Sequence, residues 1–138
     1  MMASKKKKVL VVDDENDLLL IIKTALMSDG YDVETASNGM DAIAMAGDKV
    51  PDLVILDMMM PEMNGFEVLS QLRQDPSTER TPVIMLTGIS EKGTIREALD
   101  SGVNYYIVKP FEFHDLLSKV KLAISDAESG GLAGPPMP

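Results

Sequence analysis

Short runs of consecutive apolar residues constrain the fold of this chain more than any other feature. Residues 9–12, 53–56 and 83–86 are apolar at every position. Strands buried on both faces of a parallel sheet have this pattern, whereas half-exposed hairpin strands alternate apolar and polar residues. Residues 31–36 form a weaker, alternating run, and residues 105–108 form another. We therefore expect five strands, most of them covered on both faces.

Between these runs the apolar residues recur with the period of a helix. Such stripes predict a helix after each strand. The stripes are Leu18, Ile21, Ile22, Ala25 and Leu26; Ala42, Ile43 and Ala46; Val68, Leu69 and Leu72; Ile95, Ala98 and Leu99; and Phe113, Leu116, Leu117, Val120 and Ile124. Gly30 is expected to stop the first helix, Gly47 and Pro51 the second, Pro76 the third and Gly102 the fourth. The order (βα)5 predicts an α/β fold, a doubly wound five-stranded parallel sheet with helices on both faces.

The length of 138 residues fits one domain. We expect an N-terminal extension over residues 1–6 and the folded domain over residues 7–128. Residues 129–138 are rich in Gly and Pro, which predicts a flexible tail or the start of a linker.

Composition excludes several classes of function. With 13 Lys and Arg against 22 Asp and Glu, the net charge is −9, which disfavours direct binding of nucleic acid. The absence of Cys excludes disulfides and Cys-ligated zinc, and a single His argues against a His-rich metal site. No apolar run approaches the ~20 residues of a membrane span, and none forms a signal peptide, so a cytoplasmic location is expected.

Polar residues follow four of the predicted strands, namely Asp13, Asp14, Asp57, Thr87 and Lys109. In an open α/β sheet the carboxyl ends of the strands meet at one edge, where ligands bind. Three neighbouring carboxylates repel one another and favour a hard cation such as Mg²⁺. Asp57 is placed to attack phosphorus, and the lysine and threonine could stabilise the phosphoryl oxygens. The pattern predicts an aspartyl-phosphate site.

The motifs around these residues resemble the receiver domain of two-component response regulators, of which the single-domain chemotaxis regulator is the simplest. The resemblance covers about residues 6–126. It is carried by the residues VVDDE at 11–15, LDMMMPEMNG at 56–65, VIMLTG at 83–88, the segment 98–102 and KPF at 109–111. It implies a flavodoxin-like fold with strand order 2-1-3-4-5.

The resemblance also implies roles for the site residues. Asp57 would accept a phosphoryl group from the phosphohistidine of a sensor histidine kinase or a phosphotransfer protein. Asp14, Asp57 and the backbone carbonyl of Met59 would ligate Mg²⁺, with Asp13 acting largely through water. A side chain on each of the last two strands would then contact the phosphoryl group.

Those contacts are assigned to Thr87 and Lys109. In the family, Thr87 moves toward the phosphate and the aromatic residue at Tyr106 rotates inward. This remodels the face made by the fourth helix, the strand at 105–108 and the fifth helix, where a downstream protein would bind. The Lys109–Pro110 bond is expected to be cis. The chain would be a switch that catalyses only its own phosphorylation and dephosphorylation, as a monomer or a phosphorylation-dependent dimer.

Two positions depart from the commonest pattern of the family. Gly88 is often Ala, and a glycine leaves the phosphate more open to water. Met59 is often a polar residue such as Asn. The backbone carbonyl can ligate the metal whatever the side chain is. In the family this side chain lies beside the attacking water, so we expect it to affect the lifetime of the phosphorylated state.

Two other classes of function are alternatives for this chain. Phosphatases and mutases with an aspartyl-phosphate intermediate usually carry a second Asp two residues after the nucleophile, where this chain has Met59. A flavodoxin-type binder of nucleotide or flavin would need a Gly-rich loop after the first strand, where Asp13 and Asp14 stand. The output stays open between a single-domain regulator and a receiver from a longer chain.

Overall fold

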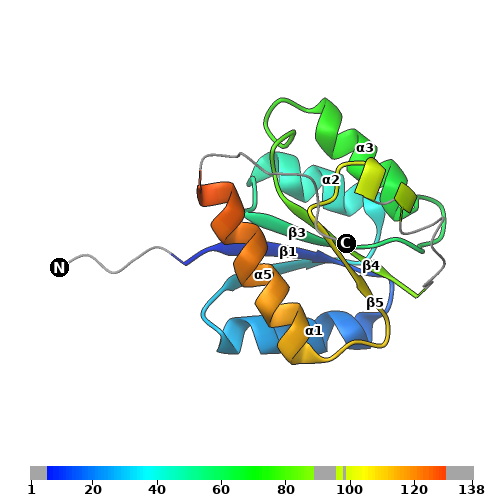
Figure 1. Ribbon diagram of the computed structural model, residues 1–138. Coiled ribbons are helices and arrows are strands. Elements are labelled where there is room, and N and C mark those ends of the chain that lie inside the picture. The colour runs from blue at the N-terminus through cyan, green and yellow to red at the C-terminus, as the bar shows by residue number, and fades with distance from the viewer. Residues whose placement is uncertain (1–5, 89–95, 98, 130–138) are drawn as a thin grey trace.

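The computed structural model describes residues 6–88, 96–97 and 99–129. Strands and helices alternate along it (Figure 1). They are β1 (Lys8–Val12), α1 (Asn16–Ser28), β2 (Asp32–Ala36), α2 (Gly39–Asp48), β3 (Leu53–Asp57), α3 (Gly65–Gln74), β4 (Val83–Thr87), β5 (Tyr105–Val108) and α5 (Phe113–Glu128). Most of the predicted fourth helix, including Ile95 and Ala98, lies outside the described residues, although residues 96, 97, 99 and 100 are helical.

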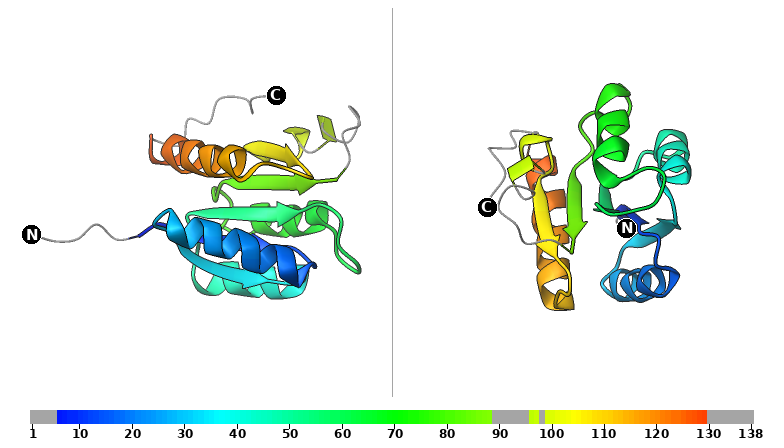
Figure 2. Two further views of the ribbon diagram at one scale, coloured as in Figure 1. Left: turned by 90° about the horizontal axis from the view of Figure 1, so that it is seen from below. Right: turned by 90° about the vertical axis from the view of Figure 1, so that its right-hand side faces the viewer.

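The strands form one five-stranded sheet in the order β2-β1-β3-β4-β5, and every neighbouring pair is parallel. Helices α1 and α5 cover one face of the sheet, and α2 and α3 cover the other (Figure 2). The predicted flavodoxin-like fold and strand order are therefore confirmed. The order of the strands reverses direction after β2, and crossovers of the usual right hand then put α1 on the opposite face from α2 and α3.

Alternating side chains of the central strands build two separate cores. On β3, Val54 and Leu56 pack with α2 and α3, whereas Leu53 and Ile55 pack with α1 and α5. All five residues of β3 and all five of β4 are buried. Burial on both faces of the sheet therefore explains the continuous apolar runs, as predicted.

Helix α1 confirms Ile22 and Leu26 of the predicted apolar stripe and corrects the rest. It buries Leu19, Ile22 and Leu26, whereas Ile21 is 50% exposed and Leu18 packs at the edge of the core. Five consecutive apolar residues, 18–22, leave the helical period ambiguous by about 100°. Only contact with the sheet selects the face that is buried.

The helix termini differ in detail from the sequence expectation. Gly47 lies inside α2, but the helix ends one residue later at Asp48, ahead of Pro51, the second residue that was predicted to stop it. Helix α3 begins with a capping box, in which the Asn64 side chain accepts from the Glu67 amide and the Glu67 carboxylate accepts from the Asn64 amide. Among the described residues, no helix has the length and apolar character needed to cross a membrane.

Candidate functional site

The sheet brings the predicted site residues together at its carboxyl edge. Asp13 directly follows β1, Asp57 ends β3, Thr87 ends β4 and Lys109 directly follows β5. The strand register pairs Asp57 with Leu86, one residue before Thr87. Residues separated by up to 96 positions in the chain thus become neighbours, as Lys109 and Asp13 do.

Three carboxylates form an acidic cluster at this edge. One carboxylate oxygen from each of Asp13, Asp14 and Asp57 lies within 4.8 Å of the other two. Asp13 and Asp57 are buried, and Asp14 is exposed. Burial, followed by the negative charge of Asp13, raises the pKa of Asp57 to about 6. A cluster of this kind is stabilised by a cation, and its all-oxygen donor set suits Mg²⁺.

The ammonium group of Lys109 provides the positive charge of the site. Its Nζ lies 2.8 Å from Asp13 Oδ2 and 3.4 Å from Asp57 Oδ1. Glu15 Oε1 is 3.6 Å from the same nitrogen. Burial alone would lower the pKa of Lys109, but the hydrogen bond to Asp13 and the charges of the surrounding carboxylates together raise it. The lysine therefore stays protonated and faces the Asp57 carboxylate.

Backbone groups orient the two buried carboxylates. The Met59 amide donates to Asp57 Oδ1 at 3.2 Å, and the Glu15 amide donates to Asp13 Oδ1 at 2.9 Å. Each amide belongs to the loop that follows its strand, so each loop holds a carboxylate in place through a backbone hydrogen bond. Sequence reasoning quoted Glu15 within a motif but assigned it no role, because a contact with Lys109 is visible only in three dimensions.

Gly65 is a site residue that the sequence analysis missed. An added Cβ there would lie 2.6 Å from the backbone oxygen of Asp57 and 2.8 Å from the Cα of Met58. The Gly65 amide donates to the Met58 carbonyl at 2.9 Å, so the loop after β3 closes back on itself. The Asn-Gly pair directly before a helical stripe was the available signal.

The remaining predicted residues lie on β4 and β5. Thr87 is buried at the end of β4, and its carbonyl accepts from the Lys109 amide at 2.7 Å. The Lys109–Pro110 peptide bond is cis. Tyr106 is half-buried against the core beneath α2 and α3, whereas Tyr105 packs on the opposite face. The two tyrosines point to opposite sides of the sheet, as their alternation predicts.

Comparison with known families accounts for this arrangement. The family model described as the response regulator receiver domain matches residues 9–121. The chain belongs to the response regulator receiver family. The acidic cluster, with Lys109 facing it, is therefore the acidic pocket of a receiver domain, and two-component signalling is its setting.

Two curated relatives illustrate the match. The phosphate regulon transcriptional regulatory protein PhoB of Rhizobium meliloti is 38% identical over 108 residues, which are 78% of this chain and 48% of PhoB. The response regulator PleD of Caulobacter vibrioides is 36% identical over 101 residues, 73% of this chain and 22% of PleD. The chain thus spans less than half the length of these relatives, and the likeness concerns the receiver domain alone.

Solved receivers agree over their whole length. Chemotaxis protein CheY4 of Vibrio cholerae is 34% identical with a TM-score of 0.82, covering 86% of this chain and 99% of that one. The receiver domain of sensor histidine kinase PA1611 of Pseudomonas aeruginosa is 26% identical with a TM-score of 0.81, covering 88% and 99%. That structure has a magnesium ion coordinated in its active site cleft. The oxygen donors of this receiver's acidic cluster are consistent with a site of the same kind.

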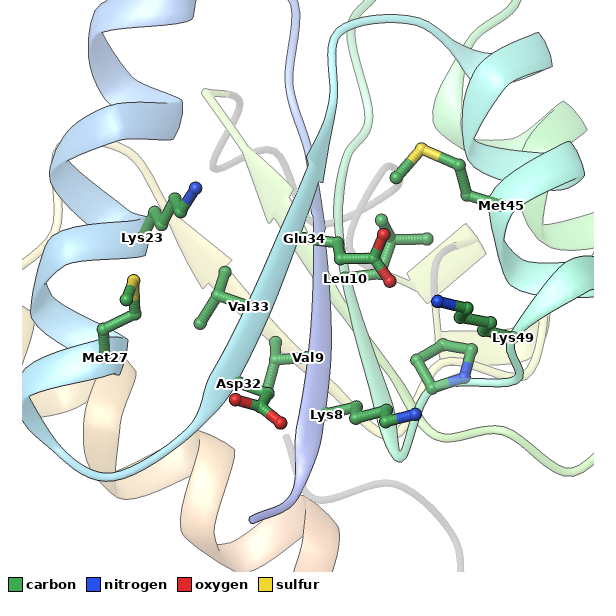
Figure 3. A pocket seen from close by; sticks show the side chains of 11 residues that line it. Lys8, Val9, Leu10, Lys23, Met27, Asp32, Val33, Glu34, Met45 and Lys49 are labelled. Carbon is green, nitrogen blue, oxygen red and sulfur yellow. The ribbon is translucent and has the colours of Figure 1, made fainter.

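A separate hollow lies at the other end of this receiver's sheet (Figure 3). It measures about 440 Å³ and is bordered by the edge strand β2, the ends of α1 and α2, and the start of β1. Lysines and carboxylates surround it, namely Lys8, Lys23, Lys49, Asp32 and Glu34. None of the predicted site residues lines it, so the hollow is distinct from the acidic pocket.

Proposed function

We propose that this receiver is a phosphorylation-controlled switch in which Asp57 accepts a phosphoryl group from the phosphohistidine of a sensor histidine kinase or a phosphotransfer protein. The observation that carries the proposal is the position of the Asp57 carboxylate, buried at the end of β3 beside Asp13 and 3.4 Å from the ammonium of Lys109. An Asp57 oxygen would attack phosphorus while the phosphorus–nitrogen bond breaks, and the imidazole nitrogen would keep the bonding electrons.

The charge on the transferred group would be offset from two sides. Asp14, Asp57 and the backbone carbonyl of Met59 are the proposed Mg²⁺ ligands, with Asp13 acting largely through water. When bound, Mg²⁺ would neutralise charge on the phosphoryl oxygens and the carboxylates. The acidic cluster supports this assignment because its oxygens already lie within reach of one ion.

Lys109 and Thr87 are the proposed contacts of the phosphoryl group itself. The Lys109 ammonium would stabilise a phosphoryl oxygen, and the Thr87 hydroxyl would donate a hydrogen bond to another. Thr87 ends β4 and Lys109 directly follows β5, and the Lys109 amide donates a hydrogen bond to the Thr87 carbonyl. Because of that hydrogen bond, movement at the end of one strand can displace the backbone at the end of the other.

We propose that this coupling reaches Tyr106, which would rotate inward when Thr87 moves toward the phosphate. The fourth helix, β5 and α5 would then present a changed surface to a downstream protein. The domain would occupy residues 7–128, with an extension at 1–6 and a tail or linker start at 129–138. Phosphorylation would act on a monomer or drive formation of a dimer, without direct contact to nucleic acid and in the cytoplasm.

An aspartyl-phosphate phosphatase or mutase is the alternative. Such an enzyme would need a general acid near the nucleophile, and the position two residues after Asp57 is Met59. Its thioether carries no proton to donate. The phosphoacceptor function therefore has the stronger support, in keeping with a family whose members are typically switches.

Phosphorylation with a small donor tests the proposal directly. Acetyl phosphate with Mg²⁺ should add one phosphoryl group, measured as intact mass, and Asp57→Asn should abolish the gain. Asp48→Asn is the matched control, because Asp48 is an exposed residue at the end of α2 with no role in the site. An unchanged mass in the parent protein, or an equal gain in Asp57→Asn, would refute the assignment of Asp57.

A further inference from the structure

The edge strand β2 has one side without a neighbouring strand. It pairs only with β1 in the five-stranded sheet. The Asp32 amide donates to the Lys7 carbonyl at 2.9 Å, so Asp32 directs its backbone groups toward β1. Because successive residues of a strand point their backbone groups in opposite directions, the amides and carbonyls of Val33 and Thr35 face away from the sheet. These groups form a free edge to which a further strand can be added.

The hollow of about 440 Å³ lies along this free edge. Figure 3 shows Lys23 and Met27 of α1 on one side of β2, with Met45 of α2 and Lys49 at the end of that helix on the other side. Each side of the free edge is therefore flanked by one methionine and one lysine. An added strand would have an apolar and a cationic contact for its side chains on both faces.

The hollow carries a net positive charge although the chain carries −9. Three lysines line it against two carboxylates, namely Lys8, Lys23 and Lys49 against Asp32 and Glu34. Within the part of the chain that the structure describes, the ion pairs involve other lysines and none of these three. The carboxylate of Glu34 lies on the side of α2, so Lys23 on the side of α1 is left to attract an external anion (Figure 3).

We propose that the free edge of β2 is a docking site for an extended segment of a partner protein, which adds to the sheet as a further strand and points acidic and apolar side chains toward α1. Backbone hydrogen bonds to Val33 and Thr35 supply affinity, and the flanking side chains supply selectivity. An acidic side chain pairs with Lys23 and an apolar one packs on Met27. On the side of α2, where Glu34 lies, uncharged polar side chains fit.

This surface is separate from the acidic pocket and from the face of the fourth helix, β5 and α5. None of the predicted site residues lines the hollow. The docking site therefore goes beyond the proposed phosphorylation switch and does not depend on the role of Asp57.

A second copy of this chain fits the edge less well than a different partner does. Two β2 strands paired antiparallel about a two-fold axis at Glu34 would set the two Glu34 side chains directly opposite each other. An axis at Val33 would set Asp32 opposite Glu34. Like charges directly opposite across two strands are destabilising. The carboxylates of β2 therefore disfavour self-pairing and leave the edge to a segment of different sequence.

A synthetic peptide tests the docking site. The probe is a short capped peptide in which Thr alternates with Glu, Val and Glu, so that one face is acidic and apolar and the other is uncharged. Hydrogen exchange followed by NMR should show slower exchange of the Val33 and Thr35 amides when the probe is bound. The Asp32 amide, which already donates to β1, should change little.

Two variants of the receiver separate the contribution of the backbone from that of charge. Thr35→Pro removes an outward amide but no hydrogen bond to β1, so binding of the probe should be lost while the fold is kept. Lys23→Glu should weaken binding about fivefold, and a probe with Lys in place of both Glu residues should restore it. Lys121→Glu is the matched control, because Lys121 is exposed on α5 outside the hollow and the change in charge is the same.

The docking site is overturned if millimolar probe does not bind, or if it binds while the Val33 and Thr35 amides exchange at unchanged rates. Equal binding to Thr35→Pro, with its fold verified by circular dichroism, would also overturn it. If that variant does not fold, Lys23→Glu and the lysine-containing probe decide the matter by the same comparison. Sedimentation that shows self-association of the receiver, with both amides protected in the absence of probe, would assign the edge to a second copy instead.

Discussion

At the scale of single residues, the site depends on side chains held in unfavourable surroundings. Asp57 is an acid buried next to another acid, and its raised pKa records the resulting free-energy cost of ionisation. The negative charge of Asp13 increases that cost, and the positive charge of Lys109 lowers it. A cation bound to the Asp57 carboxylate, or a covalent modification that removes its charge, should therefore stabilise the folded protein.

The pKa of Asp57 predicts a pH-dependent difference between the parent protein and Asp57→Asn. The folded pKa of about 6 exceeds the ordinary value of 3.8, so the folded state binds the proton more tightly than the unfolded state. The free energy of unfolding of the parent should fall as the pH rises from about 4 to about 6. In Asp57→Asn this loss should be absent, leaving the variant about 3 kcal/mol more stable near neutral pH.

Urea denaturation of both proteins at several pH values, in a metal chelator, would measure this difference. Asp48→Asn serves again as the control and should follow the parent at every pH. A constant difference between Asp57→Asn and the parent across the range would contradict the cause that we assign.

Gly65 predicts a stability effect of steric origin. Gly65→Ala would place a Cβ against the backbone of Asp57 and Met58, and should lower the free energy of unfolding by roughly 1–3 kcal/mol. Gly47→Ala in α2 should instead raise it by about 0.5–1 kcal/mol, because alanine favours a helix and the nearest atom is 3.9 Å away. Chemical denaturation compares the two, and a neutral Gly65→Ala would show that the loop is not tightly closed.

At the scale of elements, packing decided what periodicity left open. The predicted stripe of α1 contains the buried Ile22 and Leu26 but also the exposed Ile21, and α2 continues one residue past Gly47 before it ends ahead of Pro51. The strands gave no such ambiguity, because runs that are buried on both faces need no choice of face. Helix α3 was located correctly, and its three predicted apolar residues are all buried.

Two adjacent isoleucines of α1 test the corrected face. Ile22 is fully buried, so Ile22→Ala should lower the free energy of unfolding by about 2–5 kcal/mol through the cavity it leaves. Ile21 is half exposed, and Ile21→Ala should change it by less than about 1 kcal/mol. Thermal or urea denaturation of both variants provides the measurement. Similar losses of unfolding free energy in the two variants would show that Ile21 also packs against the sheet, as the sequence predicted.

At the scale of the whole molecule, the sheet gathers charge from distant parts of the chain. The net charge of −9 is a property of the chain as a whole. Three of those negative charges now belong to one cluster at the carboxyl edge, offset in part by Lys109. Ligand binding at that edge should therefore stabilise the entire fold, because each strand that supplies a ligand belongs to the same sheet.

Binding of Mg²⁺ should raise the melting temperature of the protein. A cation that binds only the folded state adds RT ln(1 + [L]/Kd) to the free energy of unfolding, about 2.7 kcal/mol at a hundredfold excess over Kd. Asp14→Asn should remove most of the increase, and since Asp14 is exposed the variant should still fold. Thermal scans with and without millimolar Mg²⁺ give the readout, with Asp48→Asn as the variant that keeps the shift. A parent protein indifferent to Mg²⁺ would contradict the proposed metal site.

Sequence patterns alone predicted the order of elements, the parallel sheet and the polar residues at the ends of its strands. These depend on local patterns, since burial on both faces requires apolar runs and the topology brings strand ends to one edge. Asp57, Thr87 and Lys109 could be named as site candidates for that reason.

The three-dimensional arrangement was needed to find the close contacts. It showed that Lys109 reaches Asp13 and Asp57, that Glu15 joins them, and that Gly65 leaves no room for a side chain. The physical reason is that hydrogen bonds and steric clashes depend on positions within a few ångströms. Sequence spacing fixes such positions along a strand or helix, but packing between elements sets them across the fold.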